Sequence, residues 1–595
     1  MRLILFAAPA FGVLASATPV TIAPAPTSPI GQEGGGPGPL AILQSICRPG
    51  DDAERLSRRG LFVAAAAWAQ SRGQAEAEPR LIDGVASADI AATASDEARP
   101  WFEQGLGLIH GFNHDEALRA FRKAQALDPD CAICLWGEAY ALGPNINKPM
   151  APEDAPRARA AAQEALAKAG AATEVERALI EAIQTRYGDG DRGALDRAYA
   201  EAMREVADRF PEHDEVQALS AEATMDAQPW DYWEPGGLQT KGMAGDALAR
   251  LETVLARNPD HVASIHLHIH LTEASDDPWR AAPHAGRLES LAPGAGHLLH
   301  MPSHTWYRVG RFLDSLAANV EAVKVDEAYL AEAREAAGPI YRYGYYPHNV
   351  HFALTSAQMA GDAATALDMG GRLDAALPME MADIEGWVQL IKASPWFARI
   401  QFGDEEELES VLAAASPEGA PAYVEAAWRY ARGEAAAKLG RPDAARAEAA
   451  ALAALNAQTD WSQAMAFMPA PQLLEIMQAT VLGRAAMAEG DLKSAIDRFA
   501  SAAEMQAALP YLEPPFWWYP ARQTLGAVLL MDGQPERAEQ AFLAALVQSP
   551  NNGWAWWGLA AAREARGDSA GAEAARTIWR SAWAPDAPEP ALERL

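Results

Sequence analysis

The sequence predicts an all-α protein in which pairs of short helices repeat along the chain. Alanine-rich segments are separated by short breaks such as Asn258-Pro259 and Ser549-Pro550, which is the pattern of successive capped helices. No alternating apolar and polar stretch is long enough to predict a β-sheet. A chain that grows by repetition need not divide into globular domains, so we expect one continuous array of helix pairs.

The repeat is clearest near the C-terminus, where its period is 34 residues. A unit that starts at Tyr519 has small and aromatic residues at fixed positions, namely Leu525, Gly526, Ala538, Phe542, Ala545 and Pro550. A unit that starts at Ala98 matches it with Trp101, Gly105, Ala117, Phe121, Ala124 and Pro129. This pattern resembles the tetratricopeptide repeat (TPR), a helix-turn-helix unit. The resemblance implies an α-solenoid whose stacked units bury a continuous core.

Weaker copies of the pattern divide the rest of the chain. They start at Val262, Gly296, Pro347, Ile476 and Gly553. We therefore expect a leader over residues 1–77, N-terminal repeats over 78–228, central histidine-rich repeats over 229–380 and C-terminal repeats over 381–595.

The charge and the first residues limit the partners and the location. A net charge of −31 argues against a nucleic-acid partner, because phosphate binding needs a basic surface. No apolar run reaches the roughly 18 residues of a transmembrane helix. Met1 to Ala17 can pass for a secretory signal, but the segment from Ser57 to Ala77, with Arg58-Arg59, resembles a twin-arginine signal more closely. We expect an exported, periplasmic protein, with translation starting downstream of Met1.

The central repeats carry many histidines on one helical face. The TPR resemblance implies that positions 2, 5, 9 and 12 of each first helix line the concave wall, since these spacings share one face. Histidine makes up 13 of the 595 residues, so composition alone predicts fewer than one histidine at the twelve such positions of three central units. Seven are histidine, namely His266, His270, His297, His300, His304, His348 and His351.

These histidines predict a transition-metal site. His266/His270 and His300/His304 are pairs at i, i+4, and Glu273 follows the first pair, which is how a helix chelates a metal ion. No cysteine is near in sequence, so zinc, copper, iron, manganese and nickel all remain open. Glu273 is a ligand or a general base, and His297 is an alternate ligand or a catalytic group. Seven imidazoles exceed one tetrahedral site, so some of them would support the ligands, act as a general acid or base, or bind a second ion.

Other features shape the expected site. Insertions around residues 143–147 and 228–233 are too long for simple repeat turns. The candidates for substrate contact are Trp230, Trp233, Trp306, Tyr307, Arg308, Tyr345 and Tyr346. The aromatic run over residues 515–520 is interpreted as core between repeats. Cys131 and Cys134 predict either a local disulfide or two buried thiols.

Three classes of function remain open from the sequence. The first is a metal-dependent hydrolase or oxidoreductase with a small molecule or peptide in its groove. The second is a scaffold that binds a peptide or partner protein, because a fold does not settle a function. The third is metal buffering or delivery. A groove for peptide termini would be rich in Lys, Arg and Asn, whereas this wall carries His and Glu, which favours the first class.

Overall fold

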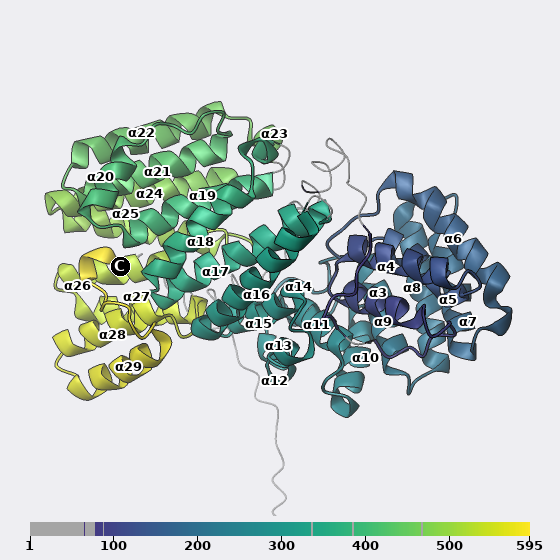
Figure 1. Cartoon of the computed structure of the whole chain (residues 1–595). Coiled ribbons are helices and arrows are strands. Elements are labelled where there is room, and N and C mark those ends of the chain that lie inside the picture. Colours follow the sequence, from purple (N-terminus) through teal and green to yellow (C-terminus); the bar gives the residue numbers. More distant parts are fainter. Residues whose placement is uncertain (1–64, 66–77, 87, 335–336, 384–385, 466–467) are drawn as a thin grey trace, which may run out of the picture. The chain divides into compact units, whose positions relative to one another are not determined.

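The computed structural model describes residues 65, 78–86, 88–334, 337–383, 386–465 and 468–595. Apart from Ala65, the predicted export signal and Cys47 lie outside these residues, and export remains a prediction. In the described part of the chain the elements are helices, and extended backbone pairs only in an isolated bridge between Trp233 and Thr240 (Figure 1). The predicted all-α class is confirmed. None of the described helices combines the length and apolar character of a membrane span.

Most helices pack in consecutive pairs (Figure 1). The pairs are α3 (Arg99–His110) with α4 (His114–Leu127), α5 (Ala132–Leu142) with α6 (Ala155–Lys168), α8 (Arg192–Arg209) with α9 (Asp214–Ala227), α17 (Tyr346–Ala360) with α18 (Ala363–Ala376), α21 (Ala422–Lys438) with α22 (Pro442–Gln458), α24 (Ala470–Glu489) with α25 (Leu492–Ala507), α26 (Ala521–Met531) with α27 (Pro535–Gln548), and α28 (Gly553–Ala565) with α29 (Ser569–Ala582). Among the intervening helices are α7 (Glu174–Ile183), α10 (Ala244–Arg257), α16 (Phe312–Ala333), α19 (Gly386–Phe402) and α20 (Glu405–Ala413).

The spacing of glycine and phenylalanine that recurs between repeats has a packing cause. A Cβ atom on Gly105 would lie 2.6 Å from the ring of Phe121, and one on Gly137 of the next pair would lie 2.4 Å from it. Gly526 stands in the same relation to Phe542, at 2.8 Å. One phenyl ring therefore fills the space that two glycines leave between neighbouring helices, so the pairs are TPR-like in packing as well as in sequence.

The central repeats depart from regular pairs. Helix α11 (Val262–Thr272) begins where the repeat pattern predicts, but short pieces replace its partner, namely η4 (Pro278–Ala281), α12 (Ala282–Ala285) and α13 (Leu288–Leu291). In the following repeat, the first helix is split at Pro302 into α14 (Gly296–His300) and α15 (Pro302–Arg308). Proline lacks a backbone N–H and fits best at a helix start, which accounts for the second interruption.

The C-terminal repeats contact the central repeats directly. The indole of Trp554 donates to the carbonyl of Gln358 at 2.9 Å, and the amide of Asn551 donates to the carbonyl of Gly310 at 2.9 Å. A simple solenoid has contacts only between neighbouring repeats. The loop between α25 and α26 also reaches α15, where Tyr511 lies against the guanidinium of Arg308 and Glu513 lies 3.1 Å from His304.

The structure also decides between the two alternatives for the cysteine pair. Cys131 and Cys134 form a disulfide at the start of α5. Both residues are buried in the core of the N-terminal repeats.

Candidate metal centre

Six of the seven predicted histidines converge in two groups of three, which we call the first and second triads. In each triad one nitrogen atom per ring lies within 4.8 Å of the others, and all the rings are buried. The first triad consists of His266 and His270 from α11 and His297 from α14, and the second of His300 from α14, His304 from α15 and His348 from α17.

The hydrogen bonds of the second triad fix the proton on His300. Its Nδ1 lies 2.6 Å from Oδ1 of Asn319, whose Nδ2 donates to the carbonyl of Ser315 at 2.7 Å. The amide oxygen therefore faces the imidazole, and Nδ1 of His300 carries the proton. The lone pair is left on Nε2, which lies 2.9 Å from Nε2 of His304.

Two carboxylates hold the other side of the His304 ring. Its Nδ1 lies 2.9 Å from Oε2 of Glu273 and 3.1 Å from Oε2 of Glu513, so Nδ1 also carries a proton. Burial disfavours the charged ring, but the carboxylates outweigh it and raise the pKa of His304 to about 9. Burial also raises the pKa of Glu513. The space between the Nε2 atoms of His300 and His304 thus suits one positive charge, either a proton or a metal ion.

The first triad has a different set of contacts. Nδ1 of His266 donates to the carbonyl of His110 at 2.7 Å, which leaves the lone pair on Nε2, 3.2 Å from Nε2 of His297. Both nitrogen atoms of His270 lack a hydrogen-bond partner among the described residues. Burial lowers the pKa of His266 to about 3, and burial together with neighbouring imidazoles holds the pKa values of His270 and His297 well below their usual value. These rings are neutral at pH 7, the form that binds metals.

Each triad is packed against one phenylalanine. The ring of Phe112 lies 4.4 to 5.8 Å from the three rings of the first triad, between centroids. Its φ angle is +56°, in the left-handed region that a bulky residue rarely adopts. Phe352 lies 4.7 to 5.1 Å from the rings of the second triad. Tight apolar packing restricts these imidazoles to one arrangement and limits the entry of water.

A cavity of about 30 Å³ lies where the two triads meet. Its volume is enough for a water molecule or a similarly small group. Both triads and both carboxylates line it, together with an asparagine and two tryptophans, namely His270, His297, His304, His348, Glu273, Glu513, Asn147, Trp230 and Trp387.

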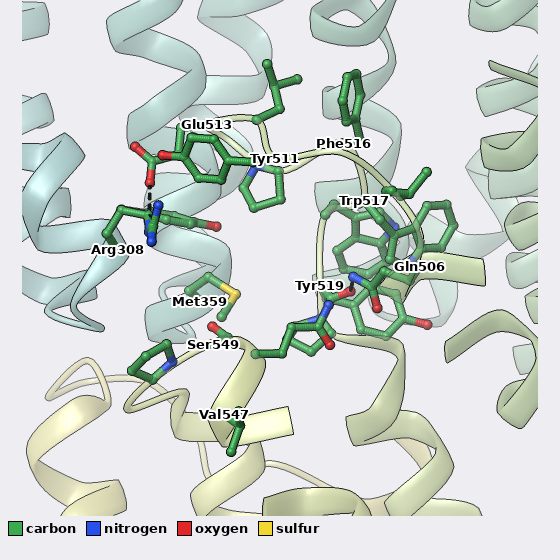
Figure 2. Close-up of a pocket in the computed structure, with 18 of the residues that line it drawn as sticks. Arg308, Met359, Gln506, Tyr511, Glu513, Phe516, Trp517, Tyr519, Val547 and Ser549 are labelled. Atoms are coloured by element: carbon green, nitrogen blue, oxygen red, sulfur yellow. Dashed lines mark hydrogen bonds and ion pairs between the residues drawn. The ribbon is translucent and has the colours of Figure 1, made fainter. Parts of the chain in front are cut away.

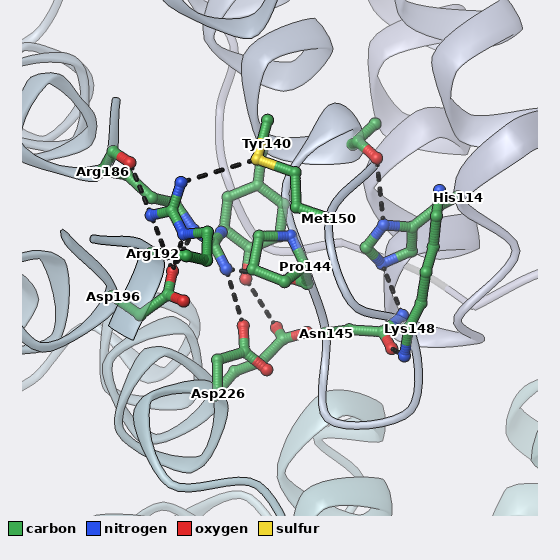
Figure 3. Close-up of polar contacts among 12 residues, drawn as sticks. His114, Tyr140, Pro144, Asn145, Lys148, Met150, Arg186, Arg192, Asp196 and Asp226 are labelled. Carbon is green, nitrogen blue, oxygen red and sulfur yellow. Dashed lines mark hydrogen bonds and ion pairs between the residues drawn. The ribbon is translucent and has the colours of Figure 1, made fainter. Parts of the chain in front are cut away.

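A buried polar network holds the loop that carries Asn147 to this cavity (Figure 3). Arg186 donates to the carbonyl of Pro144 and to Oδ2 of Asp226, each at 2.8 Å, and Nδ2 of Asn145 lies 3.1 Å from Nε2 of His114 (Figure 3). The Oδ1 atom of Asn147 is buried without a hydrogen-bond partner in the described part of the chain. The network therefore holds the polar side chain of Asn147 at the cavity wall.

Four of the predicted substrate residues lie near the triads. Trp230 lines the cavity, with its ring centroid 5.2 Å from that of His270. The ring of Tyr345 lies 4.4 Å from that of His297. Tyr307 and Arg308 lie at the edge of a larger pocket on the other side of Glu513.

The remaining predicted site residues have other contacts. The indole of Trp233 donates to the carbonyl of Leu271, and Trp306 stacks under Arg311 at 3.9 Å. The hydroxyl of Tyr346 donates to Glu327. None of these three side chains lines the cavity. His351 also lies apart from the triads, since its Nε2 is 2.9 Å from the hydroxyl of Ser394.

The larger pocket has a volume of about 260 Å³ (Figure 2). Aromatic side chains from residues 511–519 form much of its wall, so the aromatic run borders a pocket as well as packing in the core. Glu513 lines both this pocket and the small cavity. Arg308 lies 3.8 Å from Glu513 and donates to the carbonyl of Glu273 at 2.5 Å. Glu513 therefore stands between the two spaces, with Arg308 beside it on the side of the larger pocket.

Sequence reasoning named the insertion that carries Asn147 but singled out none of five residues of this centre, namely Glu513, Asn319, Asn147, Phe112 and Phe352. Glu513 precedes Pro514-Pro515 at the start of the aromatic run, far in sequence from the histidines. Such a position carries no spacing signal that links it to His304. Asn319 and Phe352 lie on predicted helices, where their direction depends on how those helices pack.

Comparisons with known proteins assign no family to this chain. No family model and no curated protein matches it. Among solved structures, it is similar to the Cut9-Hcn1 hetero-tetramer of APC/C, with 14% identity, 83% of this chain and 88% of that chain covered, and a TM-score of 0.21. It is also similar to a human IFIT1 dimer with PPP-AAAA (12%, 82% and 96%, TM-score 0.30) and to the P58(IPK) TPR domain (12%, 79% and 99%, TM-score 0.21).

Proposed function

We propose that this protein binds a divalent transition-metal ion at the second triad and uses it in a hydrolytic or oxidative reaction. The observation that carries the proposal is the pair of Nε2 atoms of His300 and His304, 2.9 Å apart with both Nδ1 protons already committed. Two lone pairs at that distance repel each other unless a proton or a metal ion lies between them, and we propose that a metal ion takes this place.

The surrounding contacts are those of metal-binding histidines. Such histidines usually donate their second ring nitrogen to a carboxylate, carbonyl or amide, which fixes the tautomer and orients the ring. Asn319 does this for His300, and Glu273 and Glu513 do it for His304. Three imidazoles leave a further coordination position, as in catalytic rather than structural sites. A metal ion held there would activate a water molecule, polarise a substrate oxygen or exchange electrons.

The protein's own groups would then handle the substrate. Glu513 reaches both the small cavity and the 260 Å³ pocket, so it is placed to accept a proton from a group that enters between them. The aromatic and proline rings of that pocket favour an apolar part of the substrate. A cavity of about 30 Å³ admits only its reacting end.

Metal content tests the proposal. The full-length protein would be exported from a suitable host, reconstituted with Zn²⁺, Cu²⁺, Fe²⁺, Mn²⁺ or Ni²⁺ in turn, and analysed by plasma mass spectrometry. We expect a bound ion that is lost in His300→Ala and kept in the matched control His351→Ala, which removes a buried imidazole outside the triads. A wild-type protein that takes up no metal contradicts the proposal.

A partner-binding scaffold is the second candidate. The TPR-like packing and the aromatic wall of the 260 Å³ pocket favour it, because aromatic-lined grooves are common docking sites for peptides. This function predicts that His300→Ala leaves partner capture unchanged. Metal buffering or delivery, the third class, predicts a bound ion with no turnover. Export to the periplasm, proposed from the motif between Ser57 and Ala77, fits each of these functions.

A further inference from the structure

We infer that the first triad is a second metal site, so that two ions face one shared cavity. The inference rests on the proposed function of the second triad, but its evidence comes from different residues. It assigns His266, His270 and His297 as ligands of a divalent transition-metal ion.

The first step is the direction of the lone pairs. Because Nδ1 of His266 donates to the carbonyl of His110, its Nε2 has only a lone pair to offer. That atom lies 3.2 Å from Nε2 of His297, and Nδ1 of His297 has no hydrogen-bond partner among the described residues. In this first pair, as in His300 and His304, the imidazole nitrogen atoms point toward each other.

The second step concerns His270, which is 2% exposed. Neither of its nitrogen atoms has a hydrogen-bond partner in the described part of the chain, and its nearest carboxylate, Glu273, is 3.8 Å away. Buried polar atoms are nearly always satisfied, so an unpartnered ring among several other imidazoles indicates a ligand. Both ring nitrogen atoms of His268, on the opposite face of the same helix, also lack a hydrogen-bond partner among the described residues, but one of them lies 3.6 Å from Glu252, and the groups of possible metal ligands in the described part of the chain do not include this ring.

The third step is that the two triads share one plan. Each combines a histidine pair at i, i+4 with a third histidine from a later helix. The rings of His270 and His304 lie 5.7 Å apart, and both line the same cavity. Oε2 of Glu273 lies between them, 3.8 Å from His270 and 2.9 Å from His304. Two ions held this way would act on the same small group, one on each side of it.

The test is a cobalt titration of the metal-free, full-length protein. Co²⁺ absorption and plasma mass spectrometry would count the bound ions in the wild type and in three variants. We expect two ions per chain in the wild type and in the control His268→Ala, and one in His266→Ala and in His300→Ala. One ion in the wild type, lost in His300→Ala but kept in His266→Ala, overturns this inference and leaves the proposed function standing. If no variant loses a bound ion, both this inference and the proposed function are overturned.

Magnetic coupling between two bound ions can be measured in the wild-type protein, so this part of the test does not require a folded variant. Wild-type protein loaded with two equivalents of Cu²⁺ should give a weakened and broadened electron paramagnetic resonance spectrum, because two ions at one cavity couple. His266→Ala, shown by circular dichroism to be folded, should give the spectrum of an isolated ion. Two uncoupled Cu²⁺ ions in the wild type would contradict a shared cavity.

Discussion

Each triad consists of three imidazole rings, but the electrostatic surroundings of the two triads differ. A neutral backbone carbonyl orients His266 in the first triad, whereas two carboxylates and an amide orient the rings of the second. The carboxylates raise the pKa of His304, while burial lowers that of His266. Identical ligand types therefore differ in their affinity for positive charge, and we expect a metal ion to fill the second triad first.

We expect the strongest difference between the two triads in the stability of the metal-free protein. His304→Ala leaves the carboxylates of Glu273 and Glu513 buried without their cation, and should lower the free energy of unfolding by about 3–5 kcal/mol. His270→Ala removes a neutral ring from the other triad and should cost clearly less. Urea denaturation followed by circular dichroism measures both. Equal losses would show that the carboxylates do not distinguish the two triads.

We expect a smaller difference between the two triads in their metal affinity after substitution of Glu513. Glu513→Gln keeps the shape of the side chain but removes its charge, and should weaken metal binding at the second triad by about 10–100-fold. The first triad, which Glu513 does not contact, should keep its affinity. Competition titrations with a chromophoric chelator measure the two affinities separately. A matched control is Glu327→Gln, whose carboxylate accepts from Tyr346 away from the cavity.

The smallest effect checks a residue that lies outside both triads. Tyr346→Phe removes the hydroxyl that donates to Glu327 at 2.9 Å, and at this half-exposed position we expect a loss of about 0.5–1 kcal/mol in the free energy of unfolding. Metal content should stay the same, since Tyr346 contacts neither triad. A change in metal content after this substitution would extend the centre beyond the residues assigned here.

Local sequence patterns were enough to place the candidate ligands on helices α11, α14, α15 and α17. The glycine and phenylalanine spacing marks the helix pairs, because Gly105 and Gly137 must leave room for Phe121. An i, i+4 spacing puts His266 and His270 on one face of α11 whatever else the chain does. The same reasoning grouped His351 with the other six histidines, although its ring forms a hydrogen bond with Ser394 instead. From its helical position the side chain of His351 could point toward the triads or toward α19, and the packing of the helices determines which direction it takes.

The helical repeats and the clustering of histidines in three of them can be predicted from the amino-acid sequence, because both depend on periodicities within one helix or one repeat. The grouping of these histidines into two triads around one cavity, and the contact of Glu513 with His304 across 209 residues of sequence, result from the tertiary packing. Contacts between distant repeats, such as Trp554 with Gln358, depend on the packing of many side chains at once. No local spacing encodes them, so the charge that distinguishes the two triads became visible only in the folded chain.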